Sequence, residues 1–366
     1  MTDYIIRRLL LTIPTLLGIL VINFLIVQTA PGGPVERTLA LWQLHGLGDS
    51  SGSLAGNTGT EVLAQQSNRA SGQNLGYPGT RGVDPELIAE LQKLYGFDKP
   101  MLERFFDMLV NYARFDFGTS FYRDISVIDL ILEKIPVSLS LGLWSTLIIY
   151  LLSIPMGIRK AVQDGSAFDR VTTLAIIIGY AIPGFLLALA LIVLFAGGSY
   201  LQWFPLRGLS SPAAANWPFW RQVIDYFWHL SLPLTALTIG GFATLTLLTK
   251  NSFLDEISKQ YVITARAMGL SEKRVLYGHV FRNAMLIIIA GMPATLVGLF
   301  FTGSLLIEVI FSLDGLGLLG YESIVKRDYP VIFATVYIFT FLGLILKLIS
   351  DISFTLIDPR IHFHSQ

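Results

Sequence analysis

The sequence predicts an all-α integral membrane protein with six transmembrane helices, and three observations carry this prediction. The 366 residues are 53% hydrophobic and 14% charged, with a mean hydropathy of +0.60, outside the range of ordinary soluble domains. Six apolar stretches approach the ~20 residues that a helix needs to cross a bilayer. The basic residues of the short connecting segments all fall on one side if the chain alternates across the membrane.

The predicted spans cover residues 9–29, 138–158, 171–197, 230–249, 284–311 and 331–353. The first is too long for a removable signal peptide and lacks a clear small-residue cleavage site, so we expect it to be retained. Five spans contain a proline, which permits a kink where neighbouring helices compensate for the missing hydrogen bond. These prolines are Pro14, Pro155, Pro183, Pro233 and Pro293.

The distribution of basic residues predicts which side of the membrane is cytoplasmic. They are Arg7 and Arg8 before the first span; Arg159, Lys160 and Arg170 between the second and third; Lys250, Lys259, Arg266, Lys273, Arg274 and Arg282 between the fourth and fifth; and Arg360 after the last. By the positive-inside rule this side, with both termini, is cytoplasmic.

The chain therefore divides into four predicted parts. Residues 1–30 hold the cytoplasmic N-terminal end and the first span, and residues 31–136 form a long periplasmic segment. Residues 137–353 form a core of five spans with a cytoplasmic loop at 250–283, and residues 354–366 form a cytoplasmic tail.

The periplasmic segment has two predicted halves. Residues 45–82 are rich in Gly, Ser, Asn, Thr and Gln and read as a flexible insert, to which the sequence assigns no function. Residues 84–136 read as amphipathic helices, the first capped by Asp84 and Pro85 and ended by Gly96.

Aromatic residues gather in the second of these halves. They are Phe105, Phe106, Tyr112, Phe115, Phe117, Phe121 and Tyr122. Two compatible interpretations remain open: the rings anchor amphipathic helices at the membrane interface, or they form a docking surface for a solute-binding protein.

The loop at 250–283 predicts a helix, a sharp turn and a second helix. Ser252 and Asp255 resemble a capping box, so the first helix is expected to begin there and to run toward Met268. Gly269 supplies a left-handed residue that ends a helix, and Ser271 can start the next. Small residues before the turn would let a partner's backbone approach closely; the plainer alternative is a basic connector between two spans.

Residues of this loop carry a resemblance to a known family. Thr264, Ala265 and Gly269 match the coupling-loop motif of binding-protein-dependent ABC importers, in which two small residues precede three arbitrary ones and a glycine, although Ile263 stands where the motif prefers glutamate. A fuller set resembles the peptide/nickel permease branch: Tyr261, residues 264–267, Gly269, His279 and residues 281–284. Arg282 stands where the broader family often has proline, which disfavours a sugar or amino-acid permease.

Other stretches of the chain extend the same resemblance. They are residues 30–35, Tyr321, residues 327–331 and residues 358–360. Together with the Gly/Ser-rich insert, they make nearly the whole chain similar to the first permease subunit of Yej-type peptide importers.

The resemblance implies a type I ABC importer permease fold in the bacterial inner membrane. It implies as partners a second related permease, two ATP-binding subunits or one fused ATPase, a periplasmic solute-binding protein, a peptide substrate and membrane lipid. It assigns the contact with the ATPase to Tyr261, Thr264, Ala265, Arg266, Ala267, Gly269 and Leu270.

Ionisable residues near the spans are the other candidate sites. Glu308, Phe311 and Gly315 match a stretch that the permease branch places at the outer mouth of the fifth core helix, so they are candidate gate or pathway residues. Lys347 and Asp351, four residues apart, are expected to pair on one face of the last span in a structural role.

Several chemistries find no support in the sequence. No G-x-x-x-x-G-K-[ST] phosphate loop occurs, so ATP is expected to act on partner subunits, and we expect this chain to bind no cofactor. The chain has no cysteine, no helical metal-ligand spacing among its five histidines and no hydrolase motif; His362 and His364 are the nearest to a metal pair. A net charge of zero gives no indication of nucleic acid.

Three alternatives to a peptide ABC permease remain at this level. A gradient-driven secondary carrier would show inverted repeats and midplane charges, of which only Lys347 is a candidate. A membrane-embedded enzyme would need a facing nucleophile and base, and no such pair is evident. An ABC permease for nickel or another small solute fits the same motifs.

Overall fold

The computed structural model describes residues 2–29, 99–123, 125–198, 200–298 and 304–357. These parts of the chain are helical apart from turns and one antiparallel bridge between Thr119 and Ser126. The predicted flexible insert at 45–82, the predicted helix at 84–96 and the tail with His362 and His364 lie outside the described residues.

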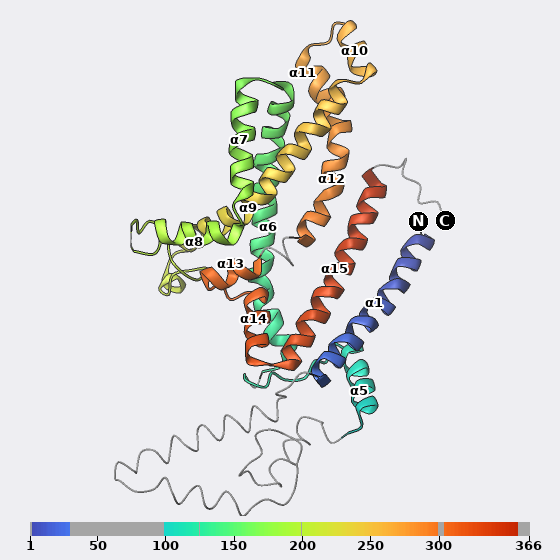
Figure 1. Ribbon diagram of the computed structural model, residues 1–366, viewed down its shortest axis with the longest axis vertical. Helices are drawn as coiled ribbons and strands as arrows, with labels where there is room; N and C mark the ends of the chain where they lie inside the picture. Colours follow the sequence, from blue (N-terminus) through green and yellow to red (C-terminus); the bar gives the residue numbers. More distant parts are fainter. Residues whose placement is uncertain (1, 30–98, 124, 199, 299–303, 358–366) are drawn as a thin grey trace, which may run out of the picture. The chain divides into compact units, whose positions relative to one another are not determined.

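The helices follow one another along the chain as Figure 1 shows. In order they are α1 (Thr2–Thr29), α5 (Met101–Ala113), α6 (Val127–Val162), α7 (Ala167–Ala181), α8 (Gly184–Phe195), α9 (Phe219–Ile257), α10 (Gln260–Ala267), α11 (Glu272–Val275), α12 (Phe281–Gly298), α13 (Ser304–Phe311), α14 (Leu316–Lys326) and α15 (Tyr329–Ile357), with a short 3₁₀ turn at Ala214–Asn216 and a π-helical turn at Leu276–Val280.

The chain forms two compact units. One comprises Met1–Leu16, Asp129–Glu322 and Thr335–Gln366, and it contains the coupling-loop and Glu308 regions; the other comprises Leu17–Ile128 and Ser323–Ala334.

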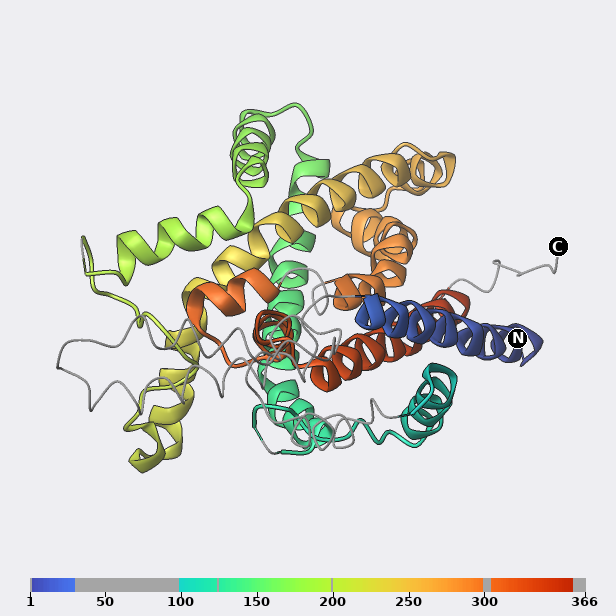
Figure 2. The same ribbon diagram turned by 60° about the horizontal axis from the view of Figure 1, so that its bottom comes forward.

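The predicted spans are confirmed as apolar helices, with differences in the third and the fifth. Five described helical stretches are long and apolar enough to cross a membrane, and α7 with α8 makes a sixth if the pair counts as one span. The predicted third span at 171–197 is not one helix, because α7 and α8 meet at 93° (Figure 2). Pro183, at the break, has no N–H to continue the ladder and adopts an extended ψ of 132°.

The predicted fifth span at 284–311 also differs. Its first part is α12, which ends at Gly298, and its last part is the separate short helix α13. The helix that leads into this span begins at Glu272, within the predicted loop, because α11, the π-helical turn and α12 follow one another without a break.

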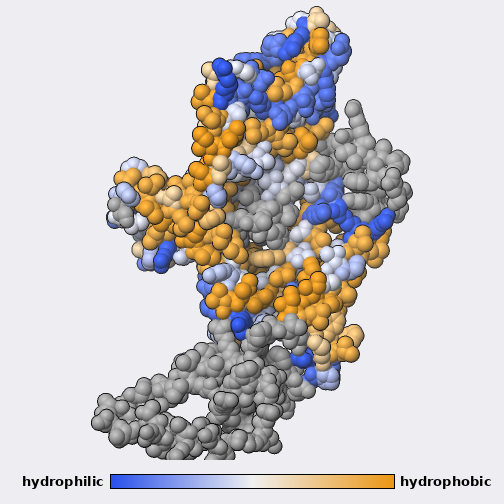
Figure 3. Space-filling model, viewed as in Figure 1, coloured by the Kyte–Doolittle hydropathy of each residue, from blue (hydrophilic) through white to orange (hydrophobic). Residues whose placement is uncertain are grey.

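Helices α6 and α9 cross closely because glycine leaves room. A Cβ added at Gly157 of α6 would lie 2.5 Å from the Cβ of Thr249 in α9, and one at Gly241 of α9 would lie 2.5 Å from Ile149 in α6. Two apolar clusters fill this unit, one including Phe253, α10 and α12, the other joining α8, α9 and α13. Around α8 the outer surface is strongly hydrophobic, as expected of a lipid-facing helix (Figure 3).

Candidate functional site

The loop between α9 and α12 has the predicted helix, turn and second helix, but its first helix begins later than predicted. Ser252 and Asp255 lie inside α9, which continues to Ile257, so the capping-box prediction was wrong. The Ser252 hydroxyl instead donates to the carbonyl of Ala284 in α12, 2.8 Å away. Packing against a helix 32 residues further along the chain therefore outweighs the local capping signal.

The turn at Gly269 confirms the predicted left-handed residue. Gly269 has φ +81°, its N–H donates to the carbonyl of Arg266, and the N–H of Leu270 donates to that of Ala265. These two bonds form a Schellman motif, and Leu270 packs on the same apolar cluster as Ala265. No atom lies within 4 Å of a Cβ added at Gly269, so backbone conformation alone requires the glycine.

Apolar side chains anchor the loop from beneath. Val262 and Ala265 of α10 and Val275 of α11 are buried in a cluster with Phe253 and Val280, and Val262 is 0% exposed. Of the residues predicted to contact a partner, Ala265 therefore faces inward.

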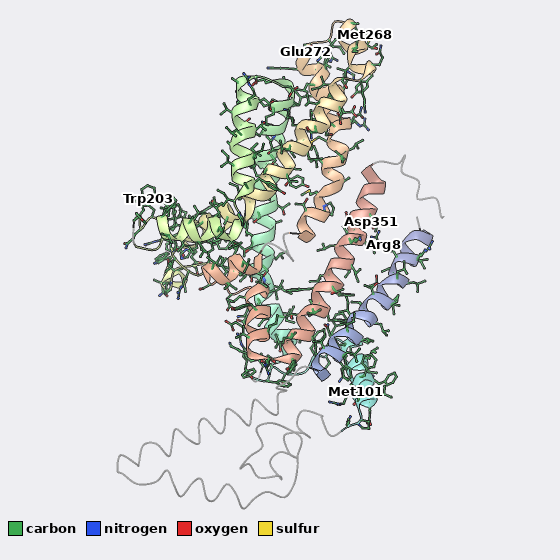
Figure 4. The ribbon with its side chains drawn as sticks, viewed as in Figure 1. Arg8, Met101, Trp203, Met268, Glu272 and Asp351 are labelled. Atoms are coloured by element: carbon green, nitrogen blue, oxygen red, sulfur yellow. The ribbon has the colours of Figure 1, made fainter. Side chains whose placement is uncertain are left out.

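The opposite face of α10 is displayed. Thr264, Arg266, Ala267, Met268 and Gly269 are exposed, and Met268 reaches 69%. Met268 and Glu272 mark the tip of the loop in Figure 4, and hydrophilic residues surround it in Figure 3. We call this loop the knob. Its base is the buried residues Val262, Ala265 and Val275, and its crown is the exposed residues Thr264, Arg266, Ala267, Met268 and Gly269.

Tyr261 ties the start of α10 to both neighbouring spans. Its hydroxyl donates to Oε2 of Glu256 in α9 at 2.7 Å and accepts from Nδ2 of Asn283 in α12 at 3.2 Å. Burial raises the pKa of Tyr261, so the hydroxyl stays protonated and able to donate. Lys259 also binds Glu256, and that hydrogen bond raises the pKa of Lys259. Sequence reasoning missed Glu256, because nothing local marks it as a partner of Tyr261.

Arg266 bridges the turn on the exposed side. Its Nε and Nη2 donate to the two carboxylate oxygens of Glu272 at 3.0 and 3.2 Å. Both side chains are solvated, so this pair contributes at most about 1 kcal/mol to stability. The pair joins the end of α10 to the start of α11 across the turn.

Glu308 is wholly buried and lies against Gly315, another of the candidate gate or pathway residues. Its side chain is 0% exposed; Oε1 accepts from the Ser138 hydroxyl of α6 at 2.8 Å, and Oε2 accepts from the N–H of Leu318 at 2.9 Å. Ser138 in turn accepts from the N–H of Leu316 at 2.8 Å. The carboxylate therefore caps the N-terminus of α14, where the helix dipole favours negative charge.

Glycines make the space for this carboxylate. A Cβ at Gly315 would lie 2.6 Å from Cδ of Glu308 and 2.7 Å from Oγ of Ser138, and one at Gly317 would lie 2.9 Å from Oε2 of Glu308. Phe311 is buried nearby in the apolar cluster of α8 and α9. The hairpin of α13 and α14 thus folds around one carboxylate.

The buried Lys134 side chain binds the turn between α13 and α14. Nζ of Lys134 in α6 lies 2.6 Å from Oδ2 of Asp314 and 2.7 Å from Oε1 of Glu133. Together with Ser138, this lysine attaches the hairpin to α6 at two points one helical turn apart.

Two further lysines join α6, α7 and α9. Nζ of Lys160 is buried and contacts Oδ1 of Asp169 at 3.0 Å, the carbonyl of Asp169 at 2.9 Å, and the hydroxyls of Thr172 and Thr173. Lys250 of α9 lies 2.8 Å from both Asp169 and Asp164. The sequence indicated these lysines only as topological charges, because their partners come from other helices.

The predicted pairing in the last span was wrong. Asp351 lies against Arg8 of α1, and no ion pair joins it to Lys347 among the described residues (Figure 4). The four-residue spacing of Lys347 and Asp351 would allow an ion pair within α15, but the Asp351 carboxylate pairs with Arg8 of α1 instead. The described parts of the chain also contain no group of three or more His, Asp or Glu side chains placed to hold a metal ion.

The comparisons with known proteins agree with this architecture. Residues 153–363 match the family model described as "Binding-protein-dependent transport system inner membrane component". The chain is 59% identical to the inner membrane ABC transporter permease protein YejB of Escherichia coli O157:H7, over 100% of both chains. It is 60% identical to the peptidoglycan transport system permease protein YejB of Agrobacterium fabrum, over 99% of each.

More distant relatives extend the pattern. The oligopeptide transport system permease protein AppB of Bacillus subtilis is 34% identical over 99% of this chain and 100% of its own. Among solved structures, the inward-facing MetNI methionine ABC transporter has a TM-score of 0.49 and 16% identity, covering 63% of this chain and 97% of its own, which is too weak a likeness to support an argument. From the family model and the full-length relatives, the chain belongs to the inner membrane components of binding-protein-dependent ABC importers, as a permease subunit.

Proposed function

We propose that this chain forms one half of the translocation pathway of an ATP-driven importer of oligopeptides or peptide-like compounds. The observation that carries the proposal is full-length similarity to permeases whose names specify oligopeptide and peptidoglycan transport. The other half is a second, related permease. A periplasmic solute-binding protein delivers the peptide.

The knob of the α9–α12 loop is the contact with the ATPase in this proposal. Its crown of Thr264, Arg266, Ala267, Met268 and Gly269 is exposed to a partner, and its buried base resists displacement. A load applied to α10 passes through Tyr261 to Glu256 of α9 and Asn283 of α12. Movement of the knob is thereby converted into movement of two spans.

The ion pairs of Lys160 and Lys250 extend this mechanical path. Lys250 lies seven residues before the end of α9 and binds the carboxylates of Asp164 and Asp169. Because Lys160 holds Asp169 to α6, the cytoplasmic ends of α6, α7 and α9 are cross-linked by charge. We propose that these ends move as one body when the ATPase subunits close.

The topology follows from the same assignment. The loop at 250–283 contacts a cytoplasmic ATPase, so the loop and both termini are cytoplasmic, and the segment between α1 and α6 is periplasmic. ATP is bound and hydrolysed by the partner subunits, either two chains or one fused chain, while this chain binds no cofactor and carries out no catalysis.

Transport in vesicles tests the proposal against the alternatives. The chain, its second permease and its ATPase are reconstituted in proteoliposomes, and uptake of a labelled oligopeptide is measured with binding protein outside and ATP inside. We expect uptake to require both, and to vanish with an ATPase variant that cannot hydrolyse ATP. Uptake driven by a proton gradient without ATP would identify a secondary carrier instead, and uptake of nickel but not peptide would correct the substrate.

A further inference from the structure

Helix α5 has three distinct edges, and one of them is apolar and uncovered. Phe105 and Tyr112 form an inward edge, and Tyr112 packs edge-on against Phe117 with ring centroids 4.9 Å apart. Leu102, Phe106 and Val110, spaced four residues apart, form an exposed apolar stripe on which Phe106 is 63% exposed.

The third edge of α5 is polar. Glu103 and Asp107 are exposed on it, each lying within 4 Å of Lys99 just before the helix. Asn111 continues the same edge one turn later. The helix therefore separates a charged face from an apolar stripe over its whole length, which is the pattern of helices that lie in a membrane surface.

One contact fixes the depth of α5 relative to the bilayer. The rings of Phe105 and Phe24 meet edge-on with centroids 5.3 Å apart, and Phe24 lies in the last turn of the apolar run of α1, which the polar residues Gln28 and Thr29 follow in the sequence. An apolar stretch ends where the hydrocarbon ends, so Phe24 marks the boundary between acyl chains and headgroups. Helix α5 is packed at that level.

We propose that α5 lies in the periplasmic headgroup layer, with Leu102, Phe106 and Val110 inserted among the acyl chains and Glu103 and Asp107 in water. The occupant of the stripe is lipid rather than protein. Helix α5 packs through Phe105 on Phe24 of α1, a helix long and apolar enough to cross a membrane, whose own Leu17 and Ile22 are exposed as lipid-facing residues would be. Phe and Leu are typical of the apolar face of helices that lie in this layer, as Leu102 and Phe106 are here.

This arrangement gives α5 a mechanical role in the periplasmic segment. The chain emerges from the first span and returns to the second through residues that include α5, so a helix held in the interface fixes the height of that segment above the bilayer. The periplasmic side assigned to α5 rests on the proposed topology, whereas its place in the membrane interface rests on membrane insertion of α1 and does not depend on what the protein transports.

Spin-label accessibility in liposomes tests the inference directly. Because the chain has no cysteine, single variants Leu102→Cys and Phe106→Cys can be labelled in the assembled transporter, with the cysteine-free parent as the blank for partner subunits. Glu103→Cys and Asp107→Cys are matched controls on the same helix. Collision rates with oxygen, which concentrates in lipid, and with a water-soluble nickel chelate are measured at each position.

We expect the relative accessibility to oxygen and to the nickel chelate to be opposite on the apolar and the polar edges of α5. Labels at 102 and 106 should favour oxygen over the nickel chelate by several-fold relative to labels at 103 and 107. Equal access of the nickel chelate at all four positions would overturn the inference, because α5 would lie in water. Exclusion of both reagents at 102 and 106 would also overturn it, since a protein subunit would then cover the stripe.

Discussion

The two hairpins of the core, the α9–α12 loop and the α13–α14 hairpin, are held in place by opposite means. Apolar side chains such as Val262 and Val275 fix the first, and its polar side chains point outward. A buried carboxylate, Glu308, fixes the second through hydrogen bonds to Ser138 and the start of α14. The first hairpin exposes the residues that we propose contact the ATPase, and the second turns its carboxylate inward.

The difference teaches what each hairpin can tolerate. Apolar packing is non-directional, so a knob anchored by it can take a force without losing specific bonds. A buried carboxylate depends on every donor around it, and its loss leaves those donors unsatisfied. We therefore expect substitutions in the α13–α14 hairpin to destabilise the protein more than substitutions in the knob. In the knob, we expect substitutions at the turn to have the main effect.

The largest effect should come from removing the carboxylate. Glu308→Ala leaves the Ser138 hydroxyl and the Leu318 N–H without their acceptor, and each buried unsatisfied group costs about 1–3 kcal/mol. Thermal unfolding of the purified complex should shift markedly downward, and transport should be lost. Asp129→Ala, which removes an exposed carboxylate from α6, is the control. An unchanged melting temperature for Glu308→Ala would show that the hairpin is held by something else.

A single methyl group at Gly315 should have the next largest effect. The Cβ of Gly315→Ala would lie 2.6–2.7 Å from Glu308 and Ser138, and overpacking of this kind typically costs about 1–3 kcal/mol. Gly320→Ala is a matched control in α14, because nothing lies within 4 Å of its Cβ. We expect lower thermal stability for the first variant only. Equal stability of the two would contradict the close packing around the carboxylate.

The turn of the knob should respond to backbone conformation rather than to space. Gly269→Val places a β-branched residue at φ +81°, at a cost of roughly 1–2 kcal/mol, whereas Asn tolerates this conformation. We expect Gly269→Val to abolish transport while remaining inserted in the membrane, and Gly269→Asn to retain most of it. Uptake assays on membranes with matched expression decide between them; normal uptake by the valine variant would count against the knob.

The smallest effect should follow loss of the Tyr261 hydroxyl. Tyr261→Phe removes one bond to Glu256 and one from Asn283, and each is worth about 0.5–1.5 kcal/mol. The apolar anchor remains, so stability should fall little, while ATP hydrolysis per peptide transported should rise because α10 is less firmly tied to α9 and α12. A simultaneous measurement of both rates tests this, with Tyr277→Phe on the neighbouring exposed surface as control. An unchanged ratio would remove Tyr261 from the mechanical path.

Much of the fold was predictable because its determinants are local. Apolar stretches of membrane length identify spans, and Gly269 identifies a left-handed turn from its position after small residues. The resemblance to the coupling-loop motif also pointed to Tyr261 and Ala265, although it did not reveal that Ala265 faces inward.

The remaining features depend on partners distant in sequence. Ser252 was expected to cap a helix, but its hydroxyl meets Ala284 of α12. The sequence indicated Lys160 and Lys250 only as topological charges, but both bind Asp169 of α7 in the structure. Asp351 pairs with Arg8, which lies near the other end of the chain. Pro183 predicts a kink, but only the packing of α8 determines that the bend reaches 93°.

Proximity of the knob to an ATPase is the central claim, and cross-linking measures it most directly. The chain has no cysteine, so Met268→Cys places the only thiol of this chain on the crown, and Leu143→Cys on the exposed surface of α6 provides the control. A short thiol-to-amine cross-linker is applied to the assembled transporter in membranes. We predict an adduct between Met268→Cys and the ATP-hydrolysing subunit that is absent with Leu143→Cys; no adduct from the crown, in a complex that still transports peptide, would contradict the account.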